Sequence, residues 1–363
     1  MLENEKISVH QFRVLVTFFT IGTSILVYPS ILARYAKQDA WLVVIISIGI
    51  GLAVIWMFSK MTQFFPNMNL AQINEKVFGK WLGKFFTFFY VLVAFIASAE
   101  LLYNSGTFFR LNLMLETPVE VLHIMTALLL VMAVRIGLET FSRAAELFWV
   151  IFILLFLMLL FVIPEIKFQN IQPVLENGVK PLLFPTLILV SVSTFNAIYL
   201  LMIFPASVSN PQGAQRAFYI GLIIGGMITF ITTILAILVL GADLTARTRF
   251  PSYLLAQKIN VGEFVKRIEV IVATMWFIAV YFKLILYFYA CCLGLGQMLN
   301  LKSYRPVVLP MGMILTVFAS MMFPNVVQQQ KWDTEGMLML SNIAGGFLPL
   351  LIVIVGYFRR RKA

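Results

Sequence analysis

Two ionisable side chains lie inside long apolar stretches of this sequence. Glu100 is embedded in AFIASAELLYN, and Lys283 is embedded in AVYFKLILYFY. A charge within a membrane is costly unless it is paired or faces a polar cavity, which makes both residues candidates for a functional site. Their predicted depths differ by roughly 10 Å, so we expect the two to face one cavity without direct contact. For Lys283, snorkelling of the long side chain towards the membrane surface is an open alternative.

Two further residues extend this candidate site by helical spacing. Tyr287 lies one turn after Lys283, and Ala97 lies one turn before Glu100, so each shares a helix face with its charged neighbour. The ring or hydroxyl of Tyr287 would close over a ligand, and the small Ala97 would leave room for one. Ordinary helix packing is the alternative for Tyr287.

Small polar residues gather in the middle of two other apolar stretches, FFTIGTSILVYPS and LVSVSTFNAIY. They are Gly22, Thr23 and Ser24 in the first, and Ser191, Ser193, Thr194 and Asn196 in the second. Phe195, between the last two, is included in the candidate site. A single cluster of this kind also fits a packing notch between helices. A matched pair indicates two helices that are broken at mid-membrane, where the unwound backbone lines a polar cavity. Half-helix N-termini attract a carboxylate and half-helix C-termini attract an ammonium, so the predicted ligand is a zwitterion such as an amino acid.

The elements that position these residues are predicted to be membrane-spanning helices. Hydrophobic residues make up 61% of the chain and charged residues 12%, and apolar runs of about 18 residues or more recur along it. The runs are continuous and do not alternate, which excludes a β-barrel. We therefore predict an all-α polytopic membrane protein. Its ten expected spans lie at about residues 11–33, 40–62, 82–106, 118–137, 144–163, 179–204, 215–241, 266–296, 307–324 and 335–358.

The ten spans divide into two halves of five, and the broken helices one and six take the same place in each half. This predicts one transporter-like domain over residues 1–363, built as a 5+5 inverted repeat of about 8–165 and about 178–360. An even number of spans puts both termini on one side, and the basic tail FRRRKA indicates the cytoplasm. Residues 69–84 are expected to form an amphipathic helix at that face, and residues 242–267 are expected outside.

The sequence offers little for an enzyme. It contains no cluster of metal-ligating residues, no nucleophile beside a base and no phosphate-binding loop, so no catalytic residue, metal or cofactor is predicted. The net charge of +11 is spread over short loops, which is typical of membrane topology and not of a nucleic-acid-binding face. Cys291 and Cys292 lie in an apolar run and are expected to pack inertly. The expected partners are therefore the lipid bilayer and a small molecule, without nucleic acid.

Three segments carry a resemblance to a known family. They are YPSILARYAKQDAW (28–41), FFPNMNLAQINEKVFGKWLGK (64–84) and RIEVIVATMWFIAVYFKLILYFY (267–289). The chain resembles the spore germination permeases, the B-type subunits of nutrient germinant receptors, over essentially its whole length. The resemblance implies a ten-span fold of the amino acid–polyamine–organocation superfamily. It also implies a location in the spore inner membrane, beside an A-type subunit and a lipoprotein C-type subunit.

Residues and resemblance together favour a receptor subunit that binds a small nutrient in a mid-membrane cavity and triggers germination. Two other functions stay open, because a receptor, a carrier and a channel can share one cavity. The chain would then be an amino acid permease coupled to protons or cations, or a ligand-gated ion-conducting subunit. The identity of the nutrient is beyond the sequence.

Overall fold

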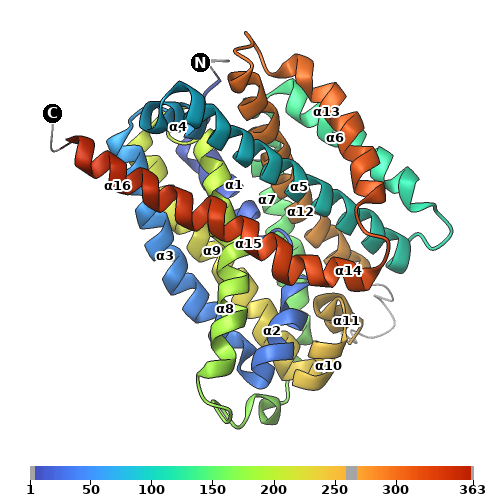
Figure 1. Ribbon diagram of the computed structural model, residues 1–363. Helices are drawn as coiled ribbons and strands as arrows, with labels where there is room; N and C mark the ends of the chain where they lie inside the picture. Colours follow the sequence, from blue (N-terminus) through green and yellow to red (C-terminus); the bar gives the residue numbers. More distant parts are fainter. Residues whose placement is uncertain (1–4, 259–267, 361–363) are drawn as a thin grey trace.

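The computed structural model describes residues 5–258 and 268–360, and its described residues form helices without any β-strand (Figure 1). Segments η1 to η4 are 3₁₀-helical, and η6 and η7 are π-helical. In chain order the elements are α1 (Val9–Ile21), α2 (Tyr28–Ala36), η1 (Lys37–Asp39), α3 (Ala40–Phe64), α4 (Leu70–Phe78), α5 (Lys80–Asn112), α6 (Val119–Ile136), α7 (Leu138–Leu159), η2 (Leu160–Glu165), η3 (Phe168–Ile171), α8 (Lys180–Ser193), η4 (Phe195–Met202), α9 (Pro211–Leu240), α10 (Ala242–Arg247), α11 (Pro251–Gln257), α12 (Ile268–Met298), α13 (Arg305–Met321), α14 (Val326–Lys331), η6 (Trp332–Gly336), α15 (Met337–Asn342), η7 (Ile343–Phe347) and α16 (Leu348–Arg360).

The described part of the chain contains eight helical stretches that are long and apolar enough to cross a membrane, and α1 and α13 are shorter apolar helices. The prediction of an all-α multi-pass membrane protein is therefore confirmed. Tyr28–Phe64 counts as one apolar stretch, but within it α2 ends at Ala36 and α3 begins at Ala40, between the expected spans one and two. The number of ten spans and the inverted repeat remain predictions.

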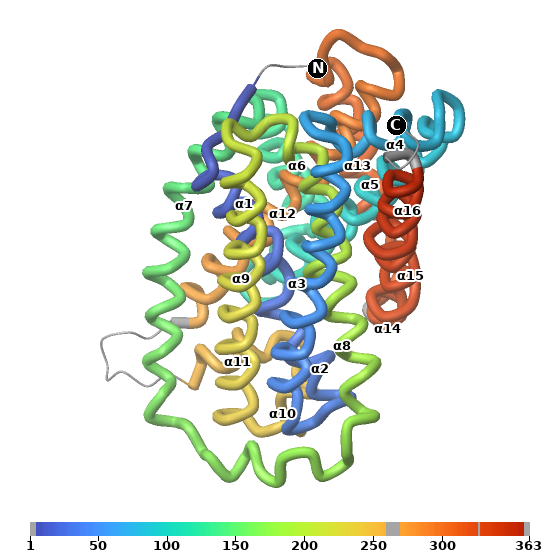
Figure 2. The backbone as a smooth tube through the Cα atoms, turned by 90° about the vertical axis from the view of Figure 1, so that its left-hand side faces the viewer, coloured from blue at the N-terminus to red at the C-terminus, as the bar shows by residue number. Residues whose placement is uncertain are grey.

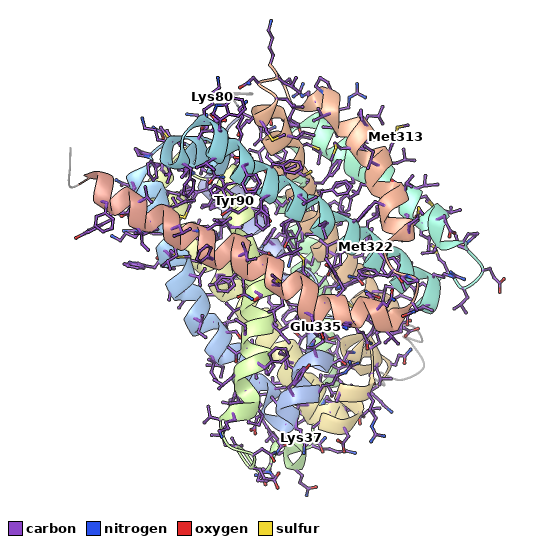
Figure 3. The ribbon with its side chains drawn as sticks, in the orientation of Figure 1. Lys37, Lys80, Tyr90, Met313, Met322 and Glu335 are labelled. Carbon is purple, nitrogen blue, oxygen red and sulfur yellow. The ribbon has the colours of Figure 1, made fainter. Side chains whose placement is uncertain are left out.

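The helices form a bundle with two distinct ends. Figure 2 shows the start of α1 and the end of α16 at one end, and α10 at the other. We call these the near end and the far end. In Figure 3, Lys80 lies at the near end and Lys37 at the far end. Helix α1 packs against α7, α9 and α12, and α12 also packs against α5. Helix α12, which carries Lys283, is therefore a direct neighbour both of α5, which carries Glu100, and of α1, which ends beside Gly22.

The last membrane helix runs without interruption from α14 to α16 and crosses the front of the bundle in Figure 1. It contains the two π-helical turns η6 and η7. The second turn touches span six, because a Cβ atom on Gly345 would come within 3.0 Å of the carbonyl group of Phe195. Only glycine allows the two backbones to approach so closely.

Two predicted surface segments are shorter than expected. Asn69 caps α4 together with Gln72, as its position before the helix suggested. Helix α4 ends at Phe78, however, and α5 begins at Lys80, so the segment 69–84 is not one helix. The predicted outer segment contains the short helices α10 and α11, and its part from residue 259 lies outside the described residues, as does the tail beyond residue 360.

Candidate functional site

Span one is interrupted where the small polar cluster predicted a break. Helix α1 ends at Ile21, α2 begins at Tyr28, and residues 22–27 form turns between them. Gly22 has a φ of 25°, which is disfavoured for any residue with a Cβ atom. Pro29 lies in the first turn of α2, where the missing N–H has no helical partner to lose.

Span six is interrupted in a different way. Helix α8 ends at Ser193, and after Thr194 the chain continues as the 3₁₀ helix η4. The change in hydrogen-bond spacing leaves carbonyl groups at the end of α8 open to other donors. The carbonyl oxygen of Val192 accepts such a bond from Lys283.

Lys283, on α12, lies between the two breaks. Its side chain is 1% exposed, and its Nζ donates to the Val192 carbonyl oxygen at 3.1 Å. The ammonium lies 5.1 Å from the centre of the Phe19 ring, within the range of a cation–π contact. A Cβ atom on Gly22 would come within 3.0 Å of Cδ of Lys283. The lysine stem therefore fills the space that the glycine leaves open, and the side chain points into the bundle instead of snorkelling.

Tyr287, one turn further along α12, connects the same two spans. Its ring centre lies 4.9 Å from that of Phe19 in span one and 5.3 Å from that of Tyr199 in span six. Its hydroxyl forms a hydrogen bond with the side chain of Asn196. The Oδ1 atom of Asn196 is buried and has no hydrogen-bond partner among the described residues, so it is a free acceptor beside the helix break.

Glu100, on α5, faces the last span. Its Oε2 accepts a hydrogen bond from Nε1 of Trp332 at 3.3 Å, and its carboxyl group adjoins that of Asp333. Glu100 and Lys283 attract one another electrostatically. Their hydrogen bonds go to Trp332 and Val192, so this attraction acts across a gap.

The hydroxyl groups of the two polar clusters are mostly occupied by their own helices. Ser24 Oγ donates to the Thr20 carbonyl oxygen at 3.1 Å, and Ser193 Oγ donates to the Leu189 carbonyl oxygen at 2.6 Å. Such bonds to the preceding turn are a common way to satisfy a buried hydroxyl. Both serine hydroxyls are therefore hydrogen-bonded, and the two side chains take up little space at the breaks. Thr23 and Ala97 are also buried, at 6% and 2% exposure.

Two residues of the span-six cluster pack against other helices. The hydroxyl of Thr194 lies against Gly51 of α3. The backbone of Phe195 contacts Gly345, and its ring lies 3.5 Å from a Cβ position on Gly346. The sequence grouped both residues with the candidate ligand site, and in the structure they also join span six to α3 and to the last span.

Sequence reasoning missed the contribution of the last span. Trp332 and Asp333 both contact Glu100 from η6, yet the polar stretch QQQKWDTEG was expected to precede a span that begins at residue 335. The available signal was the indole of Trp332 beside an acidic residue, shortly before the apolar run that begins at Met337. That pattern is also typical of an interfacial loop.

The broken helices and the polar groups at their junction define a class, a multi-pass helical membrane protein with a transporter-type fold. Among solved structures, the chain is similar to Mhp1, a nucleobase–cation-symport-1 family transporter, in a closed conformation with bromovinylhydantoin bound. The TM-score is 0.69 with 13% sequence identity, over 96% of this chain and 78% of that chain. At this identity the likeness concerns the fold alone.

The chain belongs to the family described as spore germination protein, whose family model matches residues 6–327. Spore germination protein KB of Bacillus subtilis (strain 168) is 28% identical over 99% of this chain and 97% of that protein. Spore germination protein B2 of the same strain is 23% identical over 97% of this chain and 94% of that protein. The resemblance seen in the sequence is confirmed, and the chain is a germination-related membrane protein.

Proposed function

We propose that this chain is the membrane subunit of a nutrient germinant receptor, and that a small germinant, most simply an amino acid, binds where the two helix breaks meet. The membership in the spore germination family supports the receptor. The arrangement of Gly22, Asn196 and Lys283 supports the place and the class of ligand.

The observation that carries this proposal is the position of Lys283. Its buried ammonium group has a neutral carbonyl oxygen as its hydrogen-bond partner. Burial of a charge costs several kcal/mol unless a counter-charge pairs with it directly, and Glu100 attracts Lys283 only across a gap. A ligand carboxylate would supply that counter-charge, and Oδ1 of Asn196 would accept a hydrogen bond from the ligand ammonium.

The same position suggests how occupancy would change the protein. The stem of Lys283 fills the space beside Gly22, so a ligand at the break has to move the lysine. Such movement alters the contact between α1 and α12, which pack side by side. A ligand shifts this equilibrium only by binding the two arrangements with different affinity. We propose that the shift is relayed to partner subunits.

The proposed setting follows from the family. The partners are an A-type subunit and a lipoprotein C-type subunit, in the spore inner membrane. Both termini are proposed to be cytoplasmic, which agrees with the start of α1 and the end of α16 lying at the same end of the bundle (Figure 2).

Germination of spores that carry Lys283→Met tests the proposed site. Methionine keeps much of the length and removes the charge, so we expect normal protein levels and loss of the nutrient dose–response. The measurement is nutrient-triggered release of spore contents in a host that lacks its own copy of the gene. Lys180→Met is the matched control, because Lys180 is exposed at the start of α8 and should respond normally. A normal dose–response of Lys283→Met spores would refute the site.

A flux measurement separates the receptor from the two alternatives. The purified chain in proteoliposomes is given labelled amino acid with and without a proton or sodium gradient. We expect binding without accumulation and without an ion current. Gradient-driven accumulation would establish a permease, and a ligand-dependent current carried by the chain alone would establish an ion-conducting subunit.

A further inference from the structure

A second polar cavity lies towards the far end of the bundle, apart from the two helix breaks. Its volume is about 300 Å³. Helix α2, the end of α5, the connection between α10 and α11, and the start of the last span all contribute to it. Figure 3 shows Glu335, one of its lining residues, on the last span, which passes in front of α2 in Figure 1. The lining residues that matter for the argument are Arg34, Asn104, Arg249, Gln329, Gln330 and Asp333.

Two guanidinium groups face this cavity with neutral hydrogen-bond partners. Nε of Arg34 donates to the Ala246 carbonyl oxygen at 3.0 Å, and its Nη1 lies 3.5 Å from Oε1 of Gln330. Nη2 of Arg249 donates to Oε1 of Gln329 at 2.7 Å. Each guanidinium has five N–H donors, so both keep donors for a further acceptor. Two such groups on one small cavity favour a carboxylate ligand, which a guanidinium binds through two parallel hydrogen bonds.

A pair of acidic groups adjoins the same cavity. Asp333 lines the cavity, and its carboxyl group is hydrogen-bonded to that of Glu100 on one side and attracted to Arg249 on the other. Two adjoining carboxyl groups give the cavity an acidic wall opposite its guanidinium groups. An ammonium group is the donor that suits such carboxyl groups.

The size and position of the cavity restrict the class of ligand further. A volume of about 300 Å³ is at the lower end of the range for small-molecule pockets, which suits a single amino acid and excludes a folded or extended peptide. Asp333 also connects the cavity to the deep site, because it adjoins Glu100 and Glu100 attracts Lys283. A ligand beside Asp333 would therefore lie next to Glu100.

We propose that this cavity is a second ligand site, which takes a small zwitterion such as an amino acid. The carboxylate of the ligand lies against Arg34 and Arg249, and its ammonium lies against Asp333. The inference rests on the proposed function in one respect, that the same class of ligand occupies the deep site at Lys283. This second site, which we call the outer site, holds the ligand before it passes Glu100 to the deep site at Lys283.

Binding stoichiometry of the full chain in lipid nanodiscs tests the second site. The probe is the tritiated standard L-amino acid that raises the melting temperature of the wild-type protein most. We expect two equivalents bound to the wild type, one to Arg249→Gln, one to Lys283→Met and none to the double variant. Loss of a charged hydrogen bond should raise the dissociation constant of the outer site about ten- to hundredfold. Arg247→Gln is the matched control, since Arg247 is exposed at the end of α10, and should bind two equivalents.

The variants separate the two sites from one another. Two equivalents bound to Arg249→Gln would overturn the second site and leave the deep site standing. Two equivalents bound to Lys283→Met, with one bound to Arg249→Gln, would overturn the deep site and leave the outer one. Binding of no amino acid by the wild type would overturn both. If Arg249→Gln does not fold, Asp333→Asn replaces it, because it keeps the side-chain shape and removes the charge that attracts the ammonium. Two equivalents bound to Asp333→Asn would likewise overturn the second site.

Discussion

Replacement of Gly22 by alanine tests whether Lys283 occupies the space at the break in span one. The change has two separate costs. The φ of 25° disfavours a residue with a Cβ atom by about 1–2 kcal/mol. The new Cβ atom would also lie within 3.0 Å of Cδ of Lys283, and overpacking of this kind costs about 1–3 kcal/mol. We therefore expect Gly22→Ala to lower the free energy of unfolding by about 2–5 kcal/mol.

A double-mutant cycle separates the two costs. Lys283→Ala removes the atoms that the new Cβ would meet, so the overpacking part of the Gly22→Ala effect should disappear in that background while the backbone part remains. The expected interaction energy is about 1–3 kcal/mol. Gly178→Ala is the control for a positive-φ glycine without overpacking, because Gly178 has a φ of 70° and no neighbouring atom lies within 4 Å of its Cβ position.

The assay is equilibrium unfolding of the purified variants in mixed micelles with increasing denaturing detergent, followed by circular dichroism. Gly22→Ala should unfold at clearly lower detergent than Gly178→Ala. Equal effects of the two glycine changes, or an interaction energy with Lys283→Ala below about 0.5 kcal/mol, would show that the lysine does not lie against the break. The proposed movement of Lys283 upon ligand binding would then lose its basis.

Two further expectations concern the last span and the topology. Gly345→Ala should lower the melting temperature of the purified protein by several degrees, because its Cβ would overlap the Phe195 carbonyl group. Gly346→Ala is the control and should change the melting temperature little, because its Cβ would meet the Phe195 ring at 3.5 Å. Equal shifts for the two variants would contradict this contact. In a cysteine-free background, Lys37→Cys should react with a membrane-impermeant maleimide in intact cells and Lys80→Cys only after permeabilisation; the reverse pattern would contradict cytoplasmic termini.

The break in span one could be predicted because its cause is local. Glycine, threonine and serine in succession weaken a helix, and at mid-membrane depth a weakened helix needs a polar surrounding. The inward direction of Lys283 could also be expected, since a charged side chain in an apolar membrane helix is costly when it faces lipid. Its contact with Gly22 could not, because that contact depends on how α1 and α12 pack, which neither sequence segment contains.

Helical periodicity could not predict which neighbours the residues of the span-six cluster face. After Thr194 the chain changes to a 3₁₀ helix, in which residues repeat every three positions instead of every 3.6. Neighbouring residues therefore face different partners from those that an α-helix would give them. Phe195 consequently turns to Gly345 of the last span, while Asn196 meets Tyr287 of α12.

The π-helical turns of the last span decide which of its side chains face Glu100. A π turn holds one residue more than an α turn. If η6 returned to α-helical bonding and the extra residue moved to the next turn, the residues between would rotate about the helix axis by about 100°, the angle of one α-helical residue. Trp332 and Asp333 lie on this turn, so both would leave Glu100 while α14 and α16 kept their places. The contacts of Trp332 and Asp333 with Glu100 therefore depend on where the extra residue of the π turn lies.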